Sequence, residues 1–252
     1  MIPLFKSHYS IGRSILTLDP PNTAKSKEAD SILDLAIINK ISPIVLLEDS
    51  MSGCLEAYTN FTAAKICFIF GLRLFLVNRM DKKDEESLKQ QHKIVIFIKN
   101  LNGYKRLVKI SSLASIKGFY YEPRIDISNL SSLWSNDDLC LAIPFYDSFI
   151  WNNVMYGHIC IPDFNFAKPV FFIEDNNLPF DSCISHAVRR FAKDDYAVLE
   201  SKSIYYAKKI DFINYLAFRC INNRTTLNEP EVEHCSSNEF CVESFIEKQK
   251  RI

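Results

Sequence analysis

Short apolar runs alternate with amphipathic stretches along most of the chain, and this alternation limits the folds that the sequence can adopt. The apolar runs have the length of buried strands, and they cover residues 43–47, 72–77, 92–98, 139–145, 169–174 and 196–200. Between them, apolar residues recur at helical spacing, in residues 29–40, 52–71, 102–118, 181–194 and 208–221. Such alternation favours parallel strands joined by crossover helices. The sequence therefore predicts an α/β fold, either a barrel or a doubly wound sheet.

Three further stretches complete the expected organisation. Residues 78–91 are charged and predict a solvated loop or a short exposed helix, residues 222–244 are polar and irregular, and residues 245–252 predict an exposed helix. A chain of 252 residues is long enough for one large domain with a full core. We therefore expect a single domain over 1–252, with 222–252 as an irregular C-terminal extension that packs on it or trails from it.

Charge and cysteine usage narrow the class of protein. Thirty basic and thirty acidic residues give a formal net charge of zero, which argues against binding of nucleic acid mainly through a basic surface. The 8 cysteines contain no Cys-x-x-Cys pair and lie mostly in apolar runs, a usage typical of reduced core cysteines in the cytoplasm. We find no signal peptide, and the most apolar stretch is short and carries Arg73. The expected setting is the cytoplasm, without membrane contact and with at most indirect contact to DNA.

The stretch Lys99–Leu130, KNLNGYKRLVKISSLASIKGFYYEPRIDISNL, is distinctive. It resembles a signature of the PHP (polymerase and histidinol phosphatase) family, in the form found at the N-terminus of bacterial DNA polymerase III alpha subunits. The matching positions are Asn100, Gly103, Tyr104, Lys105, Leu107, Ser111, Gly118, Phe119, Tyr120, Pro123, Arg124, Ile125 and Asp126. Residues 4–13, 40–77, 197–231 and 236–247 resemble further family motifs in the same order. The resemblance thus covers nearly the whole chain and ends where the polymerase palm would begin.

The resemblance implies a distorted (β/α)7 barrel. Active members of the family bind two or three metal ions at the C-terminal ends of the barrel strands and hydrolyse phosphoesters, a reaction in which a metal supplies hydroxide and another stabilises the phosphate charge. Such a site needs imidazole and carboxylate ligands from several strands.

Most of these ligand positions are occupied by other residue types in this chain. The family's opening histidines correspond to Leu4 and Lys6, and its following aspartate to Arg13. Further ligand positions hold Leu47, Arg79, Ser203 and Tyr205. A cation at such a position would repel a metal ion.

Four residues are vestigial candidates for metal ligands. They are His92, His8, Glu48 and Asp49. We expect no catalytic residue, no bound metal and no other cofactor. A further hypothesis is an ion pair between Lys6 and Glu48 in the cavity where active family members hold their metal ions.

The resemblance leaves three functions open. The first is a non-catalytic scaffold, related to the polymerase III alpha subunit, that binds a replicase component such as the proofreading exonuclease or the polymerase. The second is a divergent phosphoesterase or 3′–5′ exonuclease that uses Mn, Zn, Mg or Fe ions. The third is a phage or mobile-element protein that binds and modulates the host replicase. Without a palm, none of them includes DNA synthesis by this chain alone.

Overall fold

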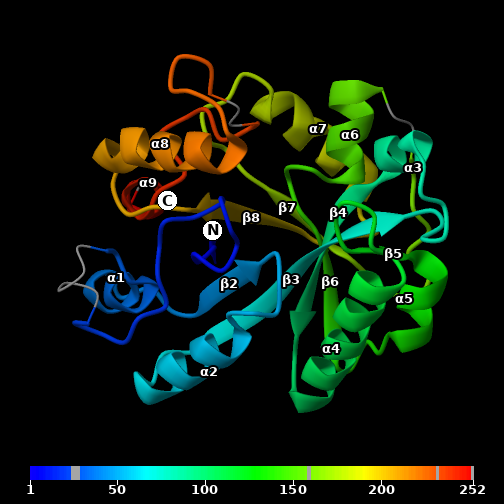
Figure 1. The fold of residues 1–252 in the computed structure, drawn as a ribbon, viewed down its shortest axis with the longest axis horizontal. Coiled ribbons are helices and arrows are strands. Elements are labelled where there is room, and N and C mark those ends of the chain that lie inside the picture. The colour runs from blue at the N-terminus through cyan, green and yellow to red at the C-terminus, as the bar shows by residue number, and fades with distance from the viewer. Residues whose placement is uncertain (24–28, 158–159, 231–232, 251–252) are drawn as a thin grey trace. The chain divides into compact units, whose positions relative to one another are not determined.

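The computed structural model of the chain describes residues 1–23, 29–157, 160–230 and 233–250 (Figure 1). The described residues group into two compact units. The first unit contains residues 1–70, 174–179 and 201–252, and the second contains residues 71–173 and 180–200.

Parallel strands form the centre of the first unit. Strand β1 (Ile2–Phe5) pairs on one side with β2 (Ile44–Glu48) and on the other with the end of β8 (Val198–Ile204). All of β2 and most of β1 are buried, as expected for strands that pack on both faces. The parallel register places the C-terminal ends of β1, β2 and β8 at the same edge.

The first unit contains four α-helices among its described residues, each overlapping a helix predicted from the sequence. They are α1 (Ile32–Asn39), α2 (Cys54–Ala63), α8 (Phe212–Asn223) and α9 (Val242–Gln249), with a 3-10 turn at Lys209–Asp211 before α8. Helix α1 begins at Ser31, whose hydroxyl accepts a hydrogen bond from the Leu33 amide at 3.1 Å, as a capping serine does. It ends at Lys40, which adopts the left-handed conformation.

The second unit contains strands of both directions. Strands β3 (Phe68–Val77, from Gly71 onward) and β6 (Leu139–Ile143) flank β4 (His92–Ile98), which runs antiparallel to both. Strand β5 (Arg124–Asp126) pairs in parallel with β3, and β7 (Val170–Ile173) pairs in parallel with β6 and β8. The expectation of mainly parallel strands is therefore correct except at β4.

The helices of the second unit are α3 (Glu85–Gln90), α4 (Leu101–Ile116), α5 (Ile127–Leu133), α6 (Phe149–Tyr156) and α7 (Asp181–Ala192). Helices α4 and α5 lie side by side (Figure 1). The distinctive stretch forms α4, β5 and α5 together. Its glycines allow close backbone contact, because a Cβ on Gly103 would lie 2.2 Å from the Asp138 carbonyl oxygen and one on Gly118 only 1.9 Å from that of Arg124.

The hydrogen-bonded order of the described strands is β2-β1-β8-β7-β6-β4-β3-β5, with an additional β2–β3 pairing. Seven of these strands therefore follow one another in a closed ring, and β5 is attached beside β3. This order confirms the predicted α/β barrel.

Several element boundaries differ from the sequence-based expectation. The helix expected over 52–71 ends at Ala63, Lys65 has a positive φ of 55°, and β3 begins at Phe68. No side chain caps the start of α7, whose N-cap residue is Phe180. Helix α9 begins at Val242 and buries Phe245, so it packs on its unit rather than being exposed; residues 251–252 of the expected helix lie outside the described residues.

Candidate functional site

A buried polar group lies where β1 and β2 end in the first unit. Lys6 directly follows β1, Glu48 is the last residue of β2, and Asp49 comes next. The Lys6 Nζ lies 2.6 Å from Asp49 Oδ2, and only 2% of the Lys6 side chain is exposed against 27% of Asp49. The ion pair of Lys6 is thus with Asp49, and the hypothesis of a pair with Glu48 is corrected by one residue. The cause is the strand geometry, because consecutive side chains at the end of β2 point in different directions.

Glu48 binds the turn that follows β1. Its Oε1 accepts a hydrogen bond from the Ser7 amide at 2.9 Å, and its Oε2 accepts one from the Ser10 hydroxyl at 2.5 Å. The Ser10 oxygen in turn accepts a hydrogen bond from the Asp49 amide at 2.9 Å. Burial raises the pKa of Glu48, whereas the hydrogen bonds from Ser10 and Ser7 and the charge of Lys6 favour its ionised form. The carboxylate therefore connects the residues after β1 to those after β2.

Two positions that the resemblance assigns to metal ligands lie next to each other on β1 and β8. Leu4 and Ser203 are Cα partners in the parallel register of these strands. Leu4 is part of the core, while Ser203 donates its amide to Glu174 Oε2 at 2.9 Å and its hydroxyl to Glu174 Oε1 at 2.7 Å. The pairing of β1 with β8 thus brings together two positions that the resemblance assigns to the same metal site.

Tyr205 and Leu47 fill space with apolar surface. The buried ring of Tyr205 stacks on those of Phe240 and Tyr215, with centroid distances of 5.5 and 6.0 Å. Leu47 lies in the core at the end of β2. Neither side chain offers the ligand atom that the family has at that position.

A second buried cation, Lys202, was missed by the sequence analysis. Its Nζ lies 3.3 Å from Glu239 Oε2 and 3.4 Å from the carbonyl oxygen of Asp175. Burial lowers the pKa of Lys202 and Lys248 adds to this effect, whereas Glu239 and Glu174 act in the opposite direction. Nothing in the sequence indicates that Lys202 meets Glu239, which lies 37 residues further along the chain.

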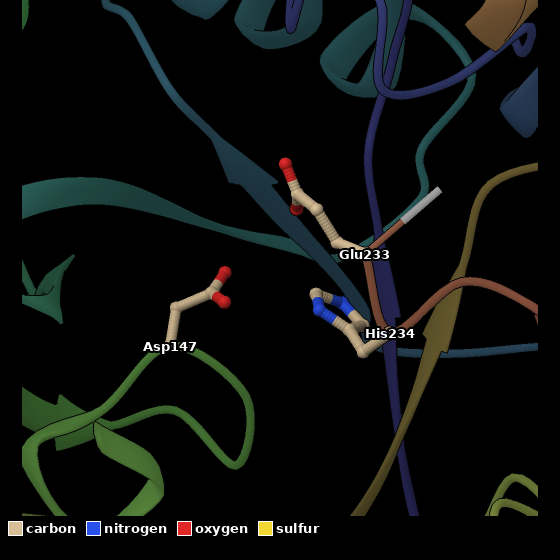
Figure 2. A group of neighbouring side chains, drawn as sticks. All are labelled: Asp147, Glu233 and His234. Atoms are coloured by element: carbon tan, nitrogen blue, oxygen red, sulfur yellow. The ribbon is translucent and has the colours of Figure 1, made fainter. Parts of the chain in front are cut away.

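His8 and Arg13 lie on the surface of the first unit. The exposed His8 ring lies 4.4 Å from that of Tyr9. Arg13 forms an ion pair of 2.6 Å with Glu233. Figure 2 shows the side chains of Glu233 and His234, which follow one another in the C-terminal segment.

His92 lies in the second unit at the start of β4. Because β4 runs antiparallel to β3, His92 pairs with Leu76 near the C-terminal end of that strand. The imidazole is buried, and burial lowers its pKa to about 4, so it is neutral at pH 7. Its Nδ1 lies 4.0 Å from the Cys160 Sγ, and its Nε2 has no hydrogen-bond partner among the described residues.

Arg79 and Asp147 each form an ion pair within the second unit. Arg79 is exposed and forms a bidentate pair with Asp81 at 2.6 and 3.0 Å. Asp147 lies on the loop that follows β6 (Figure 2) and forms an ion pair of 2.8 Å with the buried Arg73. Asp147 is the acidic side chain of this loop.

Asp126 serves as the helix cap of α5. Its Oδ1 accepts hydrogen bonds from the Asn129 amide and the Ser128 hydroxyl, both at 2.9 Å, and its Oδ2 accepts one from the Met80 amide. Burial on its own would raise the pKa of Asp126, but these hydrogen bonds hold it below the usual value. The Asp126 carboxylate is therefore ionised, and its hydrogen bonds cap helix α5.

Comparison with known proteins places these observations in a family context. The PHP domain model matches residues 26–201. The chain is 26% identical over 218 residues to the DNA polymerase III subunit alpha of Campylobacter jejuni, covering 77% of this chain and 18% of that protein. It is 25% identical over 209 residues to that of Thermus aquaticus, covering 77% and 17%, and 34% identical over 104 residues to that of Chlamydia pneumoniae, covering 40% and 8%. The chain thus spans less than a fifth of the length of these relatives. Within the described residues we find no helix with the length and apolar character needed to span a membrane.

Proposed function

Because this chain belongs to the PHP domain family, we propose that it is a non-catalytic PHP-type module that binds a component of a DNA replicase, such as the proofreading exonuclease or the polymerase. The observation that carries the proposal is the buried ion pair of Lys6 with Asp49. It lies where the family register has the second of its opening histidines. A positive charge there stabilises the carboxylate in the absence of a metal.

The side chains in the first unit do not fit a cluster of two or three metal ions. Such a cluster needs several imidazole and carboxylate groups whose lone pairs are free to point at the metals. Instead, Leu4 and Leu47 are apolar, Lys6 is cationic, and Glu48 already accepts hydrogen bonds from Ser7 and Ser10. The same argument extends to Ser203, which donates to Glu174. This filled arrangement supports a scaffold that has kept the barrel without the phosphoesterase chemistry.

The relatives support the choice of partner. Those reported above carry the name DNA polymerase III subunit alpha, and this chain corresponds to less than a fifth of their length. A module related to that region, without catalysis of its own, would act through contacts with the proteins that assemble on the polymerase. We therefore propose a role in DNA replication in the cytoplasm, with DNA contacted only through the partner.

Two measurements on the purified chain test this function. The first is metal content by elemental mass spectrometry after incubation with Mn²⁺, Zn²⁺ or Fe²⁺ and removal of excess metal, with hydrolysis of bis-p-nitrophenyl phosphate measured in parallel. We expect substoichiometric metal and a hydrolysis rate equal to that of the matched Glu48→Gln/Asp49→Asn variant. Two or more ions per chain, with hydrolysis that this variant loses, would instead support the divergent phosphoesterase.

The second measurement is direct binding to the purified polymerase III subunits and proofreading exonuclease of the organism that encodes the chain. We expect a saturable complex with one of them. A chain that binds none of these subunits would rule out the proposed scaffold role.

A further inference from the structure

Helix α4 presents apolar side chains to solvent in addition to those of its core face. Its buried positions are Gly103, Leu107, Ile110 and Ala114. On the other side, Leu101, Tyr104 and Val108 are three and four residues apart and therefore form one stripe, with exposed fractions of 69%, 41% and 37%. A surface helix of a globular protein normally carries polar residues on this side, so the stripe needs a different explanation.

Positive charge runs along the same face. Residues 99–117 contain four lysines and one arginine and no acidic residue. Arg106 forms an ion pair within the second unit, with Asp138 at 2.9 Å. Lys105 and Lys109 are one turn apart and exposed, and neither forms an ion pair with any described residue. The apolar stripe is thus bordered by cations that no described residue neutralises.

The helix that carries this face is held firmly in place. Asn100 caps its first turn through the Gly103 amide at 2.9 Å, and the helix packs on β4, β5 and α5. Gly103 and Gly118 bring it into close backbone contact at both ends. A binding partner would therefore meet a preformed surface, which reduces the entropy lost on binding.

We infer that the solvent face of α4, formed by Leu101, Tyr104, Lys105, Val108 and Lys109, docks a partner segment that presents apolar side chains next to acidic ones. Apolar anchors give such a contact its affinity, and complementary charge gives it specificity and speed of association. A second copy of the chain is a poor occupant, because a symmetric contact would bring the same cations against each other. This inference rests on the proposed function and assigns its binding surface.

The test measures binding of the purified replicase subunits to variants of the full chain. One variant, Leu101→Gln/Val108→Gln, removes apolar anchors, and another, Lys105→Glu/Lys109→Glu, reverses the charge. The matched controls are Ile37→Gln/Ile38→Gln on α1 and Lys82→Glu/Lys83→Glu in the loop before α3, all of them exposed positions. We expect each α4 variant to weaken binding about tenfold or more, with unchanged thermal unfolding, while both controls bind like the natural chain.

A photocrosslinking amino acid at position 108, with position 38 as the control, identifies the occupant in the same purified mixture. The expected product joins position 108 to a subunit peptide that contains apolar residues and a net negative charge. A crosslink to a second copy, or to a segment without acidic residues, would overturn the inference.

The two proposals fail in different ways. If the natural chain binds a subunit and the α4 variants bind equally well, the surface is wrong and the scaffold role stands. If the natural chain binds no subunit, the scaffold role fails, and the surface assignment fails with it.

Discussion

The ammonium group of Lys6 lies 2.6 Å from a carboxylate oxygen of Asp49, which joins the residue after β1 to the residue after β2. Next to this pair, Glu48 accepts hydrogen bonds from Ser7 and Ser10. The two acidic residues are thus occupied by the chain's own donors. This arrangement holds together the C-terminal ends of β1 and β2.

Replacing Lys6 with alanine should destabilise the protein, because it leaves the carboxylates of Glu48 and Asp49 close together without the cation. Removal of one partner from a buried pair costs about 3–5 kcal/mol, and we expect about 2–3 kcal/mol here since water reaches part of Asp49. Urea unfolding measures the change through the transition midpoint. The double variant Lys6→Met/Asp49→Asn should recover most of the loss, and Arg79→Ala, which breaks an exposed pair, should leave the midpoint in place. A Lys6→Ala midpoint equal to that of the natural chain would show that the pair does not stabilise the fold.

The Glu48 carboxyl should make stability fall as pH rises. Burial raises its pKa in the folded state, so the folded protein holds this proton more tightly than the unfolded chain. The free energy of unfolding therefore decreases as pH rises from the unfolded pKa of about 4.3 through the raised folded value. Comparison of urea midpoints for the natural chain and Glu48→Gln over this range isolates the effect. The variant should gain stability relative to the natural chain toward higher pH, and a constant difference would contradict the prediction.

His92 should act in the opposite direction. Burial lowers its pKa to about 4, so the unfolded chain binds a proton below pH 6.5 that the folded chain does not. The contribution of the neutral imidazole to the free energy of unfolding is fully present above pH 6.5 and is lost as pH falls toward 4. This contribution is about 3 kcal/mol in total, at 1.36 kcal/mol per pH unit. His92→Leu keeps a similar volume and should flatten the pH dependence of unfolding in this window. If the natural chain and the variant show the same slope, the imidazole is not the group responsible.

Lys202 should anchor the C-terminal segment of the first unit. Its pair with Glu239 is buried, and Lys209 also approaches Glu239 at 3.6 Å. Lys202→Ala removes the closer cation and should cost about 2–4 kcal/mol, with faster amide hydrogen exchange in residues 239–249. The matched control is Lys248→Ala, whose partner Asp175 is exposed; it should change exchange little. Equal exchange in both variants would mean that the buried lysine does not hold this segment.

Much of the architecture could be predicted from the pattern of apolar residues. The run 92–98 corresponds to β4 without error, and the segment 102–118 differs from α4 by one residue at its start and two at its end. Shorter elements such as β5 and α5 were missed, because three to seven residues carry too little periodicity to identify them. The antiparallel direction of β4 could not be predicted either, since strand direction depends on pairing between residues far apart in sequence.

The chemistry of the candidate site was only partly accessible. The sequence pointed to Lys6, Leu47, Ser203 and Tyr205 as departures from the family pattern, and the structure places each of them in the first unit as a buried residue. The ion pair was assigned to Glu48 instead of Asp49, because one residue along a strand end reverses the direction of the side chain. The expectations of metal loss, of a single domain over 1–252 and of a replicase partner stay predictions.

By itself, the sequence determined the family, the alternation of strands and helices, and the replacement of ligand residue types, because these depend on residue identity and local periodicity. Only the tertiary structure decided which charges meet: Lys6 with Asp49, Lys202 with Glu239, and Arg73 with Asp147. These pairs join residues 37 to 74 positions apart. Their energies depend on burial and on distances of about 3 Å, which the folded arrangement of strand ends sets and residue order alone does not.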